Sequence, residues 1–166
     1  MRTPSIVLLI ALIGHFGMPY ARACGDKTMR VQRGLRFYQP LAQKNPSKVL
    51  IHSAALPAGK AAELRDFLNK TGHKATSMDD LASVKSSLTT SRYDLVLTDL
   101  SDASELQRQV ESFTPQTVVV PVLLKQPKAE AKAAKKQYRV IVNNPVDGLD
   151  FLIAVARVMD LQSHKS

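Results

Sequence analysis

The chain has 166 residues, of which 45% are hydrophobic, and its formal net charge is +9. This length supplies one ordinary hydrophobic core, so an assembly of several globular domains is excluded. The single cysteine, Cys24, excludes a disulfide within the chain. The excess of lysine and arginine favours anionic partners such as acidic surfaces, lipids or polymers, although a basic charge can also serve solubility alone.

Residues 1–23 have the pattern of a secretory signal peptide. Arg2 precedes an apolar run over 6–13, and an Ala-Arg-Ala sequence stands directly before Cys24. The apolar run is too short for a comfortable membrane span, so cleavage is favoured over an uncleaved anchor. Cleavage predicts a periplasmic or secreted protein.

Cys24 would be the first residue of the exported chain. A cysteine at this position can accept a diacylglycerol anchor, but Arg22 stands where a lipidation site has a small apolar residue. The alternative is a free thiol or one paired with another chain. We expect contact with a membrane only if Cys24 is lipidated.

Residues 24–47 form a basic segment in which Arg30, Arg33 and Arg36 recur at every third position. On a helix this spacing would turn the charges progressively around the axis, and Gly34 also disfavours a long helix. The segment is therefore predicted to be an extended basic arm. It can hold an anionic partner, or it can be a solvated leader that packs one aromatic residue on the domain.

From residue 48 onward, apolar strand patterns alternate with helical patterns. The expected strands are 48–53, 73–78, 93–99, 117–125 and 138–144. Four of the expected helices have apolar residues at helical spacing, in the sets Leu64, Phe67 and Leu68; Leu81, Val84 and Leu88; Leu106, Val110 and Phe113; and Leu149, Leu152, Ile153 and Ala156. The remaining helix, over 128–137, is rich in alanine and lysine and has only a thin apolar face.

Strands this hydrophobic need cover on both faces, which parallel sheets obtain from crossover helices. The pattern predicts an α/β fold, a doubly wound parallel sheet of five strands with the flavodoxin-like order 2-1-3-4-5. This domain is expected over 48–162, followed by a short tail at 163–166.

Polar residues stand at the carboxyl ends of the expected strands. They are His52, Ser53, Asp99, Lys125 and Asn144. Ligands of doubly wound sheets lie beyond these strand ends, so the five residues are candidates for a small-ligand rim. The first and third strands are neighbours in the expected order, which would bring His52 and Ser53 close to Asp99.

The run from Lys48 to Met159 resembles the CheY-like receiver domain of response regulators. "YDLVLTDL" is similar to the third strand of that family with its phosphoacceptor aspartate, "VPVLL" to the fourth strand, and "NNPVDGLDFLIAVARVM" to the end of the fifth strand and the closing helix. The resemblance places Asp99 at the phosphoacceptor position. It also implies that the lysine-rich helix and its flanking strands form a partner-binding face.

The chemistry of the receiver family is incomplete in this chain. A receiver places Mg²⁺ among carboxylates, but its acidic pair after the first strand is replaced by His52 and Ser53. Receivers also have a hydroxyl residue at the end of the fourth strand, and this chain has none there, around Lys125. Asn144 stands where receivers have a lysine before the fifth-strand proline. Asp99 can then be an active phosphoacceptor, a member of a ligand rim, or a structural relic held by Lys125 or His52, and we favour the relic.

Other kinds of active site find little support. The four histidines lack metal-ligand spacing, no glycine-rich phosphate loop occurs, and Cys24 has no partner histidine whose position can be argued. The sequence therefore predicts no enzyme activity, no metal and no cofactor.

A basic group around the lysine-rich helix is the second candidate surface. Its members are Lys128, Lys132, Lys135, Lys136 and Arg139. A helix of this composition can be merely solvated, and nucleic acid would suit its charge but not an exported protein. We expect a non-catalytic, exported receiver-like module that contacts a protein or an anionic envelope component. The alternatives are a phosphate- or metal-linked signalling receiver that uses Asp99 and a small-ligand binder at the strand-end rim.

Overall fold

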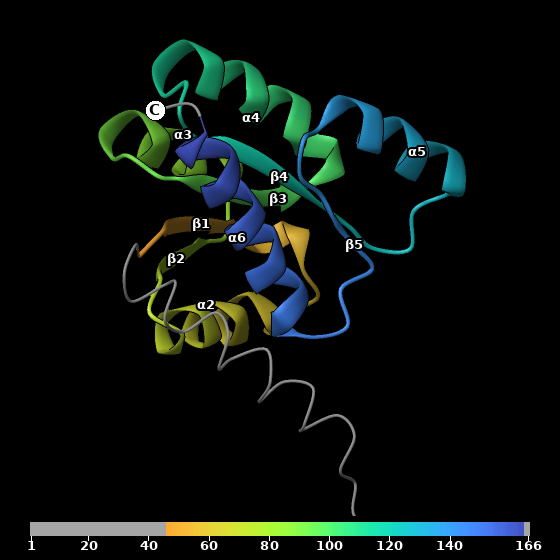
Figure 1. Ribbon diagram of the computed structural model, residues 1–166, viewed down its shortest axis with the longest axis horizontal. Coiled ribbons are helices and arrows are strands. Elements are labelled where there is room, and N and C mark those ends of the chain that lie inside the picture. Colours follow the sequence, from red (N-terminus) through yellow and green to blue (C-terminus); the bar gives the residue numbers. More distant parts are fainter. Residues whose placement is uncertain (1–45, 165–166) are drawn as a thin grey trace, which may run out of the picture.

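The computed structural model describes residues 46–164. Along the chain the elements are β1 (Lys48–His52), the short 3-10 helix η1 (Ser53–Ala55), α2 (Lys60–Lys70), β2 (Lys74–Met78), α3 (Leu81–Thr90), β3 (Leu95–Asp99), α4 (Leu100–Phe113), β4 (Val118–Leu123), α5 (Lys128–Gln137), β5 (Val142–Asn143) and α6 (Gly148–Ser163). Every strand pairing is parallel, and the order across the sheet is β2-β1-β3-β4-β5 (Figure 1). The predicted fold class and strand order are confirmed.

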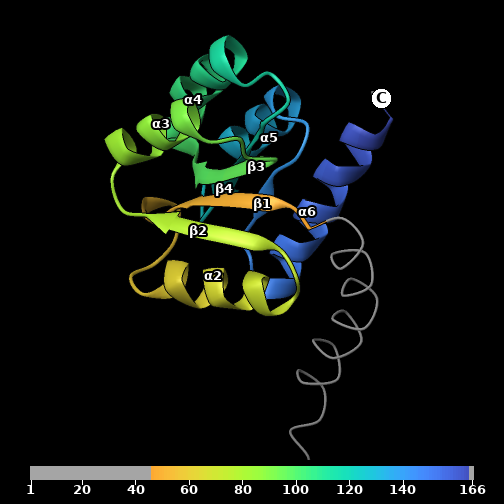
Figure 2. The same ribbon diagram turned by 90° about the vertical axis from the view of Figure 1, so that its left-hand side faces the viewer.

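Helices cover both faces of the sheet, so the three central strands β1, β3 and β4 are buried on both sides, whereas the edge strand β2 is partly exposed (Figure 2). Side chains alternate along a strand, and neighbouring positions therefore belong to different cores. In β3, Leu95 and Leu97 pack with residues of α2 and α6, whereas Val96 packs with residues of α3, α4 and α5. This two-sided burial is the reason that β1, β3 and β4 each contain a continuous apolar run.

Helix α6 begins against α2 at a glycine. A Cβ atom on Gly148 would lie 2.5 Å from the ring of Phe67, so any larger residue would have to displace that ring. Leu64 and Leu68 were predicted on the buried face of α2, and both are buried. Gly148 thus allows the last helix to close the core on this face.

Two details differ from the sequence prediction. Phe113 was expected on the buried face of its helix, but it is 65% exposed because it is the last residue of α4 and lies at the rim of a groove. The fifth strand was expected over 138–144, but β5 pairs with β4 at only two positions. Pro121 of β4 has no backbone N–H to extend this ladder, and Tyr138 packs into the core on the α4 side instead.

Several sequence predictions fall on residues outside those the structure describes. These are the signal peptide at 1–23, lipidation or pairing of Cys24, and the basic arm with Arg30, Arg33 and Arg36. Within 46–164, no helix is both long and apolar enough to cross a membrane. At the other end, α6 continues to Ser163, the first residue of the expected tail.

Candidate functional site at the carboxyl edge of the sheet

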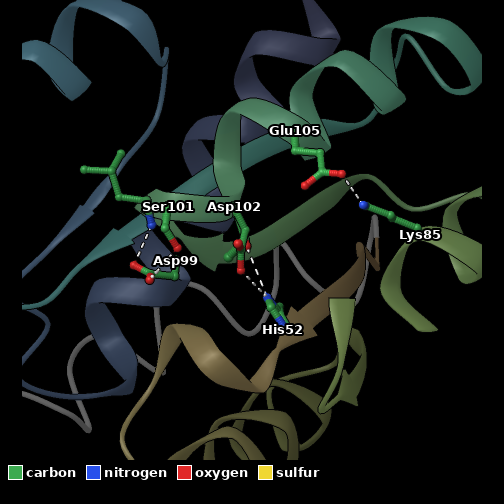
Figure 3. Close-up of polar contacts among 8 residues, drawn as sticks. His52, Lys85, Asp99, Ser101, Asp102 and Glu105 are labelled. Carbon is green, nitrogen blue, oxygen red and sulfur yellow. Dashed lines mark hydrogen bonds and ion pairs between the residues drawn. The ribbon is translucent and has the colours of Figure 1, made fainter. Parts of the chain in front are cut away.

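Asp99 ends β3 and caps the helix that follows it. Its Oδ1 accepts a hydrogen bond from the backbone N–H of Leu100 at 2.6 Å, and its Oδ2 accepts one from the hydroxyl of Ser101 at 3.0 Å (Figure 3). A carboxylate at a helix start satisfies unpaired N–H groups and interacts favourably with the helix dipole. Both oxygens of Asp99 are therefore engaged by the first turn of α4.

His52 ends β1 and is almost fully buried, with 3% exposure. Its Nδ1 lies 3.4 Å from Oγ1 of Thr98 and 3.4 Å from Oδ2 of Asp102, which is in the first turn of α4 (Figure 3). The Asp102 side chain is 28% exposed, so the imidazole is covered while its acidic partner reaches solvent. The carboxylate beside His52 is thus Asp102 and not Asp99.

The alternation of side chains explains why His52 and Asp99 do not meet. Ile51 pairs with Leu97, so the next residues along the two strands, His52 and Thr98, point together to the α4 side of the sheet. Asp99 follows Thr98 and leaves the strand on the opposite side. Within residues 46–164 no hydrogen bond or ion pair joins Asp99 to His52 or Lys125, so the expectation that one of them holds it is wrong.

Lys125 and Asn144 form a separate pair where β4 and β5 end. The backbone N–H of Lys125 donates to Oδ1 of Asn144 at 2.7 Å, and the N–H of Asn144 donates to the carbonyl of Leu123 at 2.8 Å. Lys125 and Asn144 have φ angles of 54° and 46°, in the left-handed region that costs a residue with a side chain about 1–2 kcal/mol. The Asn144 amide therefore stabilises a strained loop pair.

The predicted rim is therefore divided into local arrangements. His52 is with Asp102, Asp99 is with its own helix, and Lys125 is with Asn144, while Ser53 lies half-buried in η1. Across the described part of the chain, no group of three or more His, Cys, Asp or Glu side chains is placed to hold a metal ion. A hard cation prefers several oxygen ligands, so this edge does not fit the magnesium site of a receiver.

Sequence reasoning missed Thr98, Ser101 and Asp102. The available signal was positional: Asp102 stands three residues after the capping Asp99, in the first helical turn, and Thr98 has the same strand parity as His52.

Helix α4 is joined to α3 by an ion pair between Lys85 and Glu105 (Figure 3). The hydrogen bond and charge of Lys85 hold the pKa of the Glu105 carboxyl below its ordinary value.

Removing the cap at Asp99 tests its structural role. Asp99→Ala is expected to lower the free energy of unfolding by about 0.5–2 kcal/mol, because the start of α4 loses its acceptor. Asp99→Asn should keep most of the stability, since its amide oxygen can still accept the hydrogen bond from the N–H of Leu100 and its NH2 group can donate to the hydroxyl of Ser101. Chemical denaturation of the three proteins measures this, and equal loss in both variants would contradict a capping role.

The second candidate surface lies on α5. Lys128, Lys132, Lys135 and Lys136 are exposed, as is Arg139 just after the helix. Lys128, Lys132 and Lys135 recur at helical spacing and form one row, here termed the lysine row, about 10 Å long. Among residues 46–164, no acidic group lies within 4.0 Å of these lysines, so the row presents unpaired positive charge.

Solved structures share this architecture. NtrX from Brucella abortus, solved in complex with ATP, matches with a TM-score of 0.61 and 14% identity over 72% of this chain and 28% of NtrX. A response regulator receiver protein from Burkholderia phymatum matches with a TM-score of 0.55 and 19% identity over 69% of this chain and 95% of its own. This chain has the receiver fold.

A third receiver-fold match has a different description. It is a protein from Burkholderia pseudomallei described as related to pilus assembly, with a TM-score of 0.52, 13% identity, and coverage of 69% of this chain and 90% of its own. No protein-family model and no curated protein matches the sequence. At such low identities the likeness establishes the fold, while activity has to be argued from the residues.

Proposed function

We propose that this protein is an exported, receiver-like module that binds an anionic partner through α5 and works without phosphorylation of Asp99. The observation that carries the proposal is the lysine row, which presents Lys128, Lys132 and Lys135 to solvent with a single acidic residue, Glu130, on the same helix and no ion pair among residues 46–164. Positive charge arranged in this way attracts anionic surfaces and accelerates encounter with them. The partner is an acidic protein surface or an anionic component of the envelope.

The arrangement at the carboxyl edge supports the non-catalytic part of the proposal. Phosphoryl transfer to an aspartate needs a free carboxylate oxygen beside a metal ion. Here the oxygens of Asp99 accept hydrogen bonds from the start of α4, and His52 stands where a second carboxylate would be required. A signalling receiver that uses Asp99 is the weaker alternative for this reason.

The proposed export rests on residues 1–23, with their basic start, short apolar run and Ala-Arg-Ala sequence before Cys24. Outside the cytoplasm, the nucleotides and phosphodonors of signalling are scarce, which agrees with a module that acts by contact alone. Mass spectrometry of the exported protein should find a chain that begins at Cys24. Retention of the first 23 residues would contradict this part of the proposal.

Two treatments of the wild-type protein test the proposed activity. Capture of a partner from envelope extract should be strong at about 0.05 M salt and weak at about 1 M salt, where screening shortens the reach of charges several-fold. Acetyl phosphate with Mg²⁺ should leave both the mass and the capture unchanged. Stoichiometric phosphorylation that requires Asp99 would replace this proposal with the signalling alternative, and capture that ignores salt would remove its electrostatic basis.

A further inference from the structure

A groove of about 1130 Å³ opens at the amino edge of the sheet, opposite the strand-end rim. Its walls come from segments far apart in sequence: the turn before β3, the carboxyl end of α4, the segment that follows α5, and the end of α6. Pockets for small molecules usually have volumes of about 300–1,000 Å³. The size of this groove suits an extended polypeptide segment better than a small metabolite.

Uncovered apolar side chains gather in the lining of the groove. Phe113 is 65% exposed, although a phenylalanine ring is usually covered in a folded domain. Val118 and Leu161 also line the groove and are only partly buried, and Tyr138 forms part of the wall. Apolar side chains that remain uncovered on one concave surface are typical of a binding surface.

The charged residues that line the groove are balanced. Arg92 and Arg139 contribute two positive charges, and Asp94 and Glu111 contribute two negative charges. Charge therefore selects neither an acidic nor a basic segment. Apolar contact has to decide what this groove binds.

The described part of the chain begins beside the groove. The N–H of Lys48, the first residue of β1, donates to Oδ2 of Asp94 at 2.6 Å, and the N–H of Asp94 donates to the carbonyl of Lys48 at 2.9 Å. Asp94 lines the groove, so the residues before Lys48 join the domain at one of its walls. Figure 1 shows the start of β1 at the same edge of the sheet as the carboxyl ends of α4 and α6.

The basic arm contains apolar residues at a spacing that suits the groove. In an extended chain Leu35 and Phe37 point to one side and Arg36 points to the other. The nine residues 38–46 connect Phe37 to Ser47, and when extended they span up to about 30 Å, the diameter of a small domain. The arm is therefore long enough to place Phe37 in the groove.

We infer that the groove holds the arm of the same chain, with Leu35 and Phe37 packed against Phe113 and with Arg36 directed to solvent. Covalent attachment gives the arm an effective concentration on the order of millimolar at the groove, so modest apolar contacts suffice to hold it. A segment of another protein would first have to displace the arm. The inference goes beyond the proposed function, since the lysine row does not line the groove.

Trypsin tests the inference on the full chain, because it cleaves after arginine and the arm contains Arg30, Arg33 and Arg36. Cleavage needs a released segment, so docking should slow it. Phe113→Ser and Phe37→Ser should each speed cleavage after Arg33 by at least about fivefold, which corresponds to about 1 kcal/mol of docking. The double variant should be no faster than the faster single variant, because both substitutions remove the same contact. Mass spectrometry of the fragments measures these rates.

Val146→Ser is the matched control, because Val146 is 88% exposed and does not line the groove. Its cleavage rate should equal that of the wild type. Equal rates for the wild type and Phe113→Ser, or the same acceleration by Val146→Ser, would overturn the inference. Protection that disappears on dilution would place the arm in the groove of a second copy, and protection that disappears at about 1 M salt would mean that charge holds it. Either result would contradict apolar docking within one chain.

Discussion

Replacement of His52 by aspartate is expected to lower the free energy of unfolding by about 3–5 kcal/mol at neutral pH, the range for an uncompensated buried charge. His52 is 3% exposed, and its Nδ1 lies 3.4 Å from a carboxylate oxygen of Asp102. The substitution exchanges a partner of Asp102 for a second carboxylate. The two negative charges would repel each other in a site that water reaches poorly.

His52→Asn is the matched control, since it has nearly the same size as the aspartate and no charge. Burial and the nearby Asp102 both raise the folded-state pKa of the introduced carboxyl above its unfolded value. The neutral form of the introduced carboxyl is therefore tolerated. Below the unfolded pKa of about 3.9, His52→Asp and His52→Asn should have the same free energy of unfolding. As the pH rises through the higher folded pKa, the free energy of unfolding of His52→Asp should fall below that of His52→Asn.

Urea denaturation of both variants between acidic and neutral pH measures this difference. Added Mg²⁺ provides a second measurement. A bound cation would reduce the repulsion between the carboxylates at positions 52 and 102, but only if several oxygen ligands could surround it. Equal stability of the two variants at neutral pH would mean that this edge is hydrated in solution. In that case His52 would not exclude a receiver-type metal site.

The fold could be predicted from the sequence because its signals are local and repeated. Continuous apolar runs such as residues 95–97 indicate burial on two faces, and the structure shows that burial. The length of β5 could not be predicted, because it depends on Pro121 in the neighbouring strand and on where Tyr138 packs. Pairing between strands is a tertiary property that the pattern of one strand does not contain.

The candidate site was predicted less well because the direction of each strand-end side chain depends on the register between neighbouring strands. The sequence places His52 and Asp99 at the ends of adjacent strands, which the structure confirms. Their parities differ, so one faces α4 and the other turns into its own helix cap. The groove left no signal at all, since its walls come from element ends such as Phe113 and Gln162 that only the folded chain brings together.

Reversal of the lysine row is expected to abolish capture of the partner while the fold remains intact. Lys128, Lys132 and Lys135 are exposed, so their replacement by glutamate removes no core contact. The change near the start of α5 favours the helix dipole and the change near its end opposes it, so their effects on helix stability roughly cancel. The thermal unfolding midpoint should therefore stay close to that of the wild type.

The effect on binding should be large because three attractions become three repulsions. One exposed contact is worth only about 0–1 kcal/mol, so a single substitution can pass unnoticed. Together, the three reversals should weaken capture at low salt by at least about tenfold, which corresponds to 1.4 kcal/mol. The wild type and the triple variant should converge at high salt, where the charges are screened.

A second triple variant separates the position of the charges from their number. Lys70, Lys74 and Arg157 are exposed, carry the same total charge and lie on α2, β2 and α6. Their reversal lowers the net charge equally, so a partner attracted only by overall charge would be lost to the same extent. Retained capture by this control and lost capture by the lysine-row variant would place the interface on α5. Equal recovery by all three proteins would mean that the lysine row is merely solvated.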